Sequence, residues 1–140
     1  MAKRIALYDY IEIDNVNLSN FARSIEFTSE DERVDASGFS ASGASEFLAG
    51  ERVQEVTIEF MMARGANETH QVLYPMHRDR STFDFVWRAN VNAAASATNP
   101  ELRGQAILPN YGEGATRGEL ETASLTFLAA DSTGFVFYST

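Results

Sequence analysis

Four segments of the chain alternate apolar and polar residues with a period of two, the spacing that sends successive side chains to opposite faces of a β-strand. In the clearest of them, Val56, Ile58 and Phe60 alternate with Thr57 and Glu59. The pattern recurs at 24–28, 83–88 and 122–127. The polar set is rich in Thr, Ser and Glu, which is typical of antiparallel sheets with one wetted face. We therefore predict a mainly β fold, with strands near 5–13, 22–29, 52–62, 81–89, 103–109, 118–129 and 134–138.

One helical stretch is expected within 67–79, where Asn67 can cap the N-terminus and Glu68 suits the first turn. Val72, Leu73 and Met76 would share its apolar side. Pro75 cannot donate a backbone hydrogen bond, so we expect the helix either to start late, with the proline in its first turn, or to stop before it. Residues 29–51, 90–100 and 110–118 are predicted to be loops because turn-forming residues cluster there.

The predicted loop at 29–51 exceeds the ~12–15 residues that a structureless connection normally reaches in a compact domain. It combines acidic residues with Val34, Phe39, Phe47 and Leu48, apolar side chains that have no evident place within the chain. Loops of this kind are usually functional or ordered by a partner.

Composition limits the possible functions. The 140 residues suit a single domain, 1–140, and contain no cysteine, which excludes disulfides and thiolate metal sites. No apolar run reaches the ~20 residues of a membrane span, so no membrane partner is expected. The net charge is −9, and residues 26–59 carry −7 of it, from nine acidic and two basic residues. This charge disfavours tight nucleic-acid binding; it predicts a solvated acidic surface, or one that repels an anion or meets a basic patch.

No catalytic arrangement stands out, and we expect no enzymatic activity, no metal site and no cofactor. His70 and His77 are two helical turns apart, which is too far for one metal ion. No G-x-S-x-G motif is present. The carboxylates Glu30, Asp31 and Glu32 fall in a polar segment that would not raise their pKa. The glycines of 112–118 lack the ending of a phosphate-binding loop, so we interpret them as a hairpin turn.

Several short motifs occur in an order that resembles the major tail tube proteins of long-tailed, siphovirus-type bacteriophages. Residues 32–39 (ERVDASGF) are similar to the V-D-x-T-x-F/M-G stretch of these proteins, and residues 46–53 (EFLAGERV) to their F-x-x-G-L-x-D stretch. Around them lie an opening strand and turn, a long strand at 56–60, a helix, and a strand at 121–127 after a glycine-bearing turn.

The resemblance implies a β-sandwich or barrel-like fold with one flanking helix, and a structural subunit of the virion. Copies would form hexameric rings whose sheets join into an inner barrel, and the rings would stack into a tube that conducts DNA during ejection. The implied partners are further copies, a tape-measure protein and tail-tip or terminator proteins, with only transient, non-specific passage of DNA. The protein would be assembled in the host cytoplasm and located in the virion tail.

Two sets of site residues follow from the resemblance. The segment 29–51 would be an assembly loop with Val34, Phe39, Phe47, Leu48 and Gly50 at a subunit interface. Glu55 and Glu59 would face an acidic lumen, to which DNA does not adhere. Two alternatives stay open: another phage tail component, or a β-sandwich module that binds a carbohydrate or a protein. A contractile tail and a related injection or secretion tube also remain open.

Overall fold

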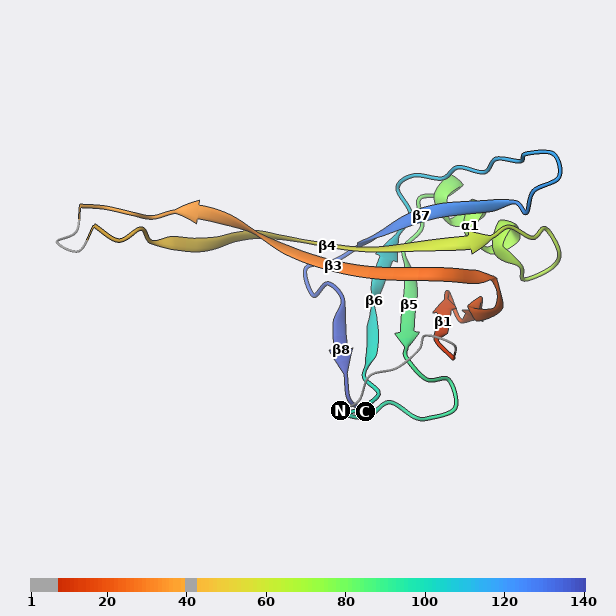
Figure 1. Ribbon diagram of the computed structural model, residues 1–140, viewed down its shortest axis with the longest axis horizontal. Helices are drawn as coiled ribbons and strands as arrows, with labels where there is room; N and C mark the ends of the chain where they lie inside the picture. The colour runs from red at the N-terminus through yellow and green to blue at the C-terminus, as the bar shows by residue number, and fades with distance from the viewer. Residues whose placement is uncertain (1–7, 40–42) are drawn as a thin grey trace.

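The computed structural model describes residues 8–39 and 43–140 (Figure 1). Strands predominate, with one α-helix in the described part of the chain. The elements are β1 (Tyr10–Ile13), β2 (Val16–Asn17), the 3-10 helix η1 (Ser19–Phe21), β3 (Ala22–Asp35), β4 (Phe47–Met61), α1 (Thr69–Arg78), β5 (Phe83–Arg88), β6 (Glu101–Ile107), β7 (Thr122–Ala129) and β8 (Val136–Tyr138).

The strands form one antiparallel sheet in the order β2-β1-β5-β6-β7-β4-β3, with β8 also paired to β6. Only two residue pairs, Ala106 with Ala129 and Ile107 with Leu128, join β6 to β7. At this narrow junction the sheet turns, so that β3, β4 and β7 run across β1, β5, β6 and β8 (Figure 1). The result is a sandwich-like body, and the predicted mainly β fold with one flanking helix is confirmed.

The core lies between these two layers and is made by the apolar members of the period-two segments. Phe127 of β7 is fully buried, and its ring contacts Phe60, Phe83 and Phe85 at centroid distances of 6.3, 5.8 and 6.0 Å. Burying one such aromatic side chain stabilises a fold by roughly 1.5–3 kcal/mol. The alternation therefore predicted the core faces of β4, β5 and β7 correctly.

Helix α1 lies within the predicted range, but its ends differ from the prediction. The N-cap is Glu68 rather than Asn67, and the helix passes through Pro75, so neither predicted alternative is right. Thr69, the first helical residue, is fully buried. Its Oγ1 accepts a hydrogen bond from the Ala63 amide at 2.8 Å and donates one to the Met61 carbonyl at 3.1 Å. These bonds tie the helix to the end of β4, and tertiary anchoring of this kind outweighs the local preference against proline.

The predicted loops at 90–100 and 110–118 are confirmed, but the loop at 29–51 and the hairpin turn at 112–118 are wrong. The segment 29–51 is mostly strand, because β3 extends to Asp35 and β4 begins at Phe47, which leaves only 36–46 between them. The glycine-bearing segment 112–118 is not a tight hairpin turn, because β6 ends at Ile107 and β7 begins only at Thr122. Strand β2 and the 3-10 helix η1 were not predicted from the sequence. The β1–β2 turn has positive φ at Asp14 and Asn15, as two-residue hairpin turns require.

Candidate assembly surfaces

A two-stranded arm projects from the body and is the most exposed part of the described chain. It consists of the distal parts of β3 and β4 with the described residues between them, 29–39 and 43–53, and it extends to one side of the body in Figure 1. The two strands pair with each other as far as Asp35 and Phe47. An isolated pair of strands is at best marginally stable in water, so the arm is a candidate for covering by another molecule.

Polar contacts hold the arm extended. Arg52 donates to both carboxylate oxygens of Asp31, its cross-strand partner, at 2.6 and 3.1 Å. Nearer the tip, Ser37 Oγ accepts a hydrogen bond from the Glu46 amide at 2.7 Å, and the Ala36 amide donates to the Glu46 carbonyl at 2.9 Å. The arm therefore has a defined shape without a hydrophobic core of its own.

The five interface residues predicted from the sequence all lie on this arm. Phe39 is fully exposed, and Val34, Phe47 and Leu48 are 43%, 52% and 57% exposed. Val34 and Leu48 are cross-strand partners, so the two apolar side chains lie on the same face.

Gly50 differs from the other four because it has a role within the arm. A β-carbon at this position would lie 3.1 Å from both the Glu32 and the Val34 side chains. The strand register shifts here, between the Asp31–Arg52 and Arg33–Ala49 pairs. Glycine therefore suits the irregular pairing of the arm, whether or not a second copy touches it.

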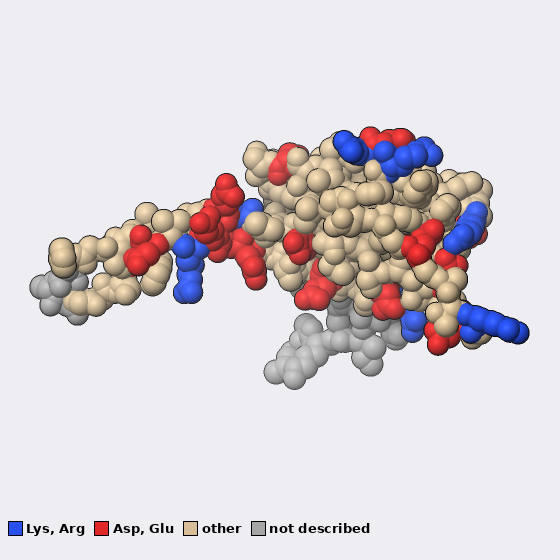
Figure 2. Space-filling view, turned by 90° about the horizontal axis from the view of Figure 1, so that it is seen from above, with Lys and Arg blue, Asp and Glu red and all other residues tan. Residues whose placement is uncertain are grey.

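Glu55 and Glu59, the proposed lumen residues, lie on the face of β4 that points away from the core. They alternate with Val56, Ile58 and Phe60, which are fully buried. Their neighbours on this face come from β3 and β7, since Glu26 pairs with Thr57 and Ser124 pairs with Glu59. Figure 2 shows further acidic side chains gathered where the arm leaves the body. The outer face of this layer is therefore acidic from the body to the root of the arm.

The sheet leaves a long edge unpaired within the described chain. β3 ends the strand order and has 14 residues, whereas β2 at the opposite end has two. An exposed strand edge is a template for pairing with another chain. The edge along β3 is thus a second feature suited to assembly.

The outer face of the layer formed by β1, β5, β6 and β8 has a compact ion network. Glu101 is 7% exposed, and its carboxylate accepts hydrogen bonds from Arg88 at 2.6 Å and Arg103 at 2.7 Å. Burial disfavours the carboxylate, but the two arginines outweigh this effect and hold the pKa of Glu101 below its usual range. On the same face the Tyr10 hydroxyl donates to Glu12, which raises the pKa of Tyr10 to about 12. These groups are hydrogen-bonded to one another and connect neighbouring strands of the layer.

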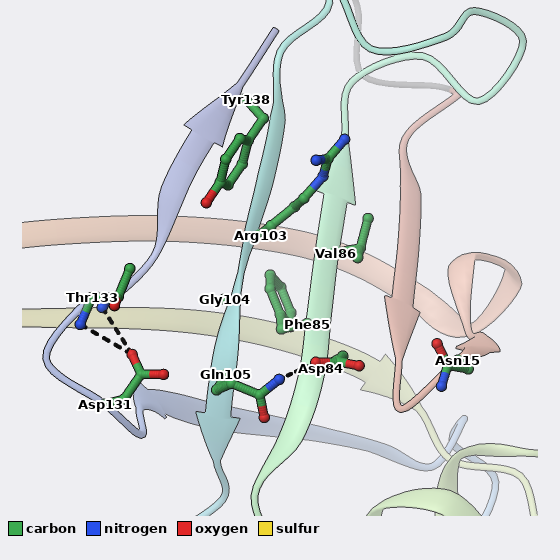
Figure 3. Close-up of a pocket in the computed structure, with 11 residues that line it drawn as sticks. Asn15, Asp84, Phe85, Val86, Arg103, Gly104, Gln105, Asp131, Thr133 and Tyr138 are labelled. Carbon is green, nitrogen blue, oxygen red and sulfur yellow. Dashed lines mark hydrogen bonds between the residues drawn. The ribbon is translucent and has the colours of Figure 1, made fainter. Parts of the chain in front are cut away.

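A cavity of about 450 Å³ lies against β5 and β6 beside this network (Figure 3). Arg103 and Tyr138 lie toward one end of it, with Asp84, Gln105 and Asp131 toward the other. Gln105 donates to Asp84, and Asp131 accepts hydrogen bonds from the Thr133 and Gly134 amides at 3.1 and 3.2 Å. The carboxylates of Asp84 and Asp131 are therefore held by hydrogen bonds within the fold.

Both histidines of α1 are hydrogen-bonded to the segment 108–121. His70 Nδ1 lies 2.9 Å from a carboxylate oxygen of Glu113, and His77 Nδ1 lies 2.9 Å from the Leu108 carbonyl oxygen. Burial disfavours the Glu113 carboxylate, but hydrogen bonds from Tyr111 and His70 hold its pKa below the usual range. Burial and the bond to Glu113 raise the pKa of Tyr111. The histidines are thus structural, and no metal-binding cluster of His, Asp and Glu occurs within the described residues.

Comparisons with known proteins give matches in structure but not in sequence. No protein-family model and no curated protein matches the chain. A solved structure of the SPP1 tail tube matches with a TM-score of 0.68 and 11% identity, over 95% of this chain and 76% of that one. The tail of an empty gene transfer agent particle, described with C6 symmetry, matches with a TM-score of 0.66 and 15% identity, over 84% and 82%.

The chain has a tail-tube fold. A third match, to the virion of a native gene transfer agent particle, has a TM-score of 0.65 and 14% identity over 84% of this chain and 85% of that one. The resemblance inferred from the short motifs is therefore confirmed at the level of fold. No helix in the described part of the chain is long and apolar enough to cross a lipid bilayer.

Proposed function

We propose that this protein is the structural subunit of a phage tail tube, that it self-assembles into stacked rings, and that it has no enzymatic activity. The observation that carries this proposal is the arm, which extends exposed apolar side chains away from a body of tail-tube fold. Exposed apolar surface of this kind in a soluble domain marks an interaction site.

Ring closure would use the free edge of β3. A sheet that ends in a 14-residue unpaired strand can extend across a subunit boundary by antiparallel or parallel pairing. Closed, head-to-tail pairing of this kind generates a cyclic ring. Six copies per ring is our expectation, in keeping with the C6 symmetry stated for one of the structural matches.

The acidic outer face of β3 and β4 would then line the channel. Glu55 and Glu59 lie on this face, opposite the core. A lumen that presents carboxylates offers no Lys or Arg to neutralise phosphates, so DNA could pass without being held. The subunit would belong to the virion tail, be assembled in the host cytoplasm, and meet a tape-measure protein and tail-tip or terminator proteins.

Size-exclusion chromatography with negative-stain electron microscopy tests the proposal directly. We expect the wild-type protein to form rings or tubes at high concentration. Phe47→Asp or Leu48→Asp should block assembly and leave a folded monomer, because each places a charge in a contact that would be buried between copies.

Leu120→Asp is a matched control, since Leu120 is 61% exposed on the body rather than on the arm. It should assemble like the wild type. A wild-type protein that stays monomeric at high concentration and binds a carbohydrate or protein ligand would favour the binding-module alternative instead. Unchanged tube formation by both arm variants would contradict the role of the arm.

A further inference from the structure

A second cavity of about 450 Å³ lies beside the C-terminal end of α1. One wall carries His77, Arg78 and Arg80, and the other is apolar, with Ile107, Leu108 and Pro109 from the end of β6 and beyond. Arg78 is ion-paired with Asp79 at 3.1 Å, so Arg80 supplies the positive charge without an internal partner among the described residues. The bond between His77 Nδ1 and the Leu108 carbonyl joins the two walls at 2.9 Å. The pocket is therefore preformed, which lowers the entropic cost of binding.

The backbone of Arg80 has an unusual conformation. The helix ends with hydrogen bonds from the Arg80 amide to the His77 carbonyl and from the Ser81 amide to the Met76 carbonyl, at 3.3 and 3.1 Å. In this type of helix end the residue at the position of Arg80 is left-handed and is usually glycine. Arg80 has φ of 55° there.

The Arg80 side chain also makes no ion pair with the part of the chain that the structure describes. The helix end requires the left-handed backbone at this position but not an arginine. An arginine where glycine is usual therefore suggests a function for its side chain.

The arm has the properties that would complement this pocket. The arm, residues 29–39 and 43–53, includes six acidic residues and two basic residues. The same segment exposes Val34, Phe39, Phe47 and Leu48. An acidic strand pair with apolar side chains matches a pocket with a basic wall and an apolar wall, and such complementarity sets the orientation of an interface.

Docking within one molecule is ruled out by shape. The arm points away from the body on one side, whereas α1 lies over the opposite half of the body (Figure 1). The arm of one copy can therefore reach this pocket only on another copy. A contact between different surfaces of two copies is head-to-tail and propagates from subunit to subunit.

We propose that the pocket lined by Arg78, Arg80 and Leu108 is the receptor for the arm of a second copy. The inference rests on the proposed function and makes it specific, because it names where the arm binds. The same basic wall could hold a free anion or a DNA phosphate, and the experiment is designed to distinguish these cases.

Disulfide trapping tests the contact, since the chain contains no cysteine to interfere. A Leu48→Cys variant mixed with a Ser81→Cys variant should give a cross-linked dimer under mild oxidation, in several-fold higher yield than Leu48→Cys mixed with Thr133→Cys. Thr133 lines the other cavity, against β5 and β6. Equal yields from the two mixtures would overturn the proposal.

Arg80→Gly separates a role in docking from a role in folding. Glycine suits the left-handed position, so the thermal midpoint of the monomer should not fall. The protein concentration needed for tube formation should rise at least about tenfold, which corresponds to a lost contact of ordinary strength. Arg117→Gly, which removes an equal charge from the segment 108–121, should leave assembly unchanged.

The possible outcomes distinguish a failure of the proposed function from a failure of the proposed receptor. If the wild-type protein never assembles, the proposed function fails first. If it assembles, but Arg80→Gly does so equally well, only the receptor is wrong. If Arg80→Gly assembles normally and loses binding to inorganic phosphate or a short labelled DNA, the pocket is an anion site and the proposal is overturned.

Discussion

Glu101 is a buried charge whose stability depends on two cationic neighbours. Its carboxylate is 7% exposed and lies between Arg88 and Arg103, each of which also covers a tyrosine ring: Tyr10 in the first case and Tyr138 in the second. The network connects β1, β5, β6 and β8 on one outer face. Removing the charge from its centre leaves two guanidinium groups without their counter-ion, which is more costly than the loss of an exposed pair.

Glu101→Gln should lower the free energy of unfolding by about 2–3 kcal/mol near pH 7. Folding lowers the pKa of Glu101 from its reference of 4.5, so the charge stabilises the fold above that pH. The stabilisation is lost as the pH falls through the folded-state pKa. Urea denaturation of wild type and variant, both carrying Phe47→Asp to keep them monomeric, should therefore give a difference that closes in acid. A difference that stays constant from about pH 7 to pH 3 would contradict this assignment.

At the scale of elements, the sequence predicts what is buried more reliably than what is exposed. Val56, Ile58 and Phe60 alternate with polar residues because one face of β4 is in the core, and this segment was identified correctly as a strand. Before Gln54 the same strand has no buried face, and the part at 47–51 was predicted to be a loop because it shows no regular alternation. These residues form a strand through backbone pairing alone, and such pairing does not require apolar and polar residues to alternate.

The residues of the candidate site were likewise only partly predictable from the sequence. The apolar residues of the arm were found from sequence because they had no evident place in a core. Arg80 was not found, since its role depends on a left-handed φ and on the approach of the helix end to Leu108. Only a helix C-terminus with arginine where glycine is usual could have indicated it.

The arm can be removed without cutting into the core, which gives a prediction for this element. Asp31 and Arg52 are cross-strand partners, so replacing 32–51 with Asn-Gly should close the hairpin with a two-residue turn. We expect a folded monomer with a thermal midpoint within a few degrees of the wild type, because the deleted residues are exposed. It should not form tubes at any concentration at which the wild type does.

Circular dichroism and light scattering would measure both properties. A large loss of thermal stability would show that the arm packs on its own body, contrary to its exposure. Assembly of the shortened protein would show that the edge of β3 is sufficient without the arm.

Across the whole molecule, the two tasks of the proposed tube subunit, contact with other copies and passage of DNA, fall on different surfaces. A tube subunit has to bind its neighbours tightly and leave its cargo free, and these demands conflict if one surface serves both. Here the arm exposes apolar groups, among them Phe39, Phe47 and Leu48, while Glu26, Glu55 and Glu59 lie on the outer face of the body layer. The arm therefore suits contact between copies, and the acidic face suits a channel surface that repels DNA.

Reversing the charge of that face tests whether it lines the channel. Tubes of a Glu55→Lys/Glu59→Lys variant should retain short double-stranded DNA inside the lumen, because lysines that neutralise phosphates bind DNA through counterion release. The retained DNA should resist nuclease and be released as the salt concentration rises. Wild-type tubes, and tubes carrying Glu119→Lys in the exposed segment before β7, should protect none. DNA that binds the Glu55→Lys/Glu59→Lys tubes but remains open to nuclease would place this face on the outside of the tube.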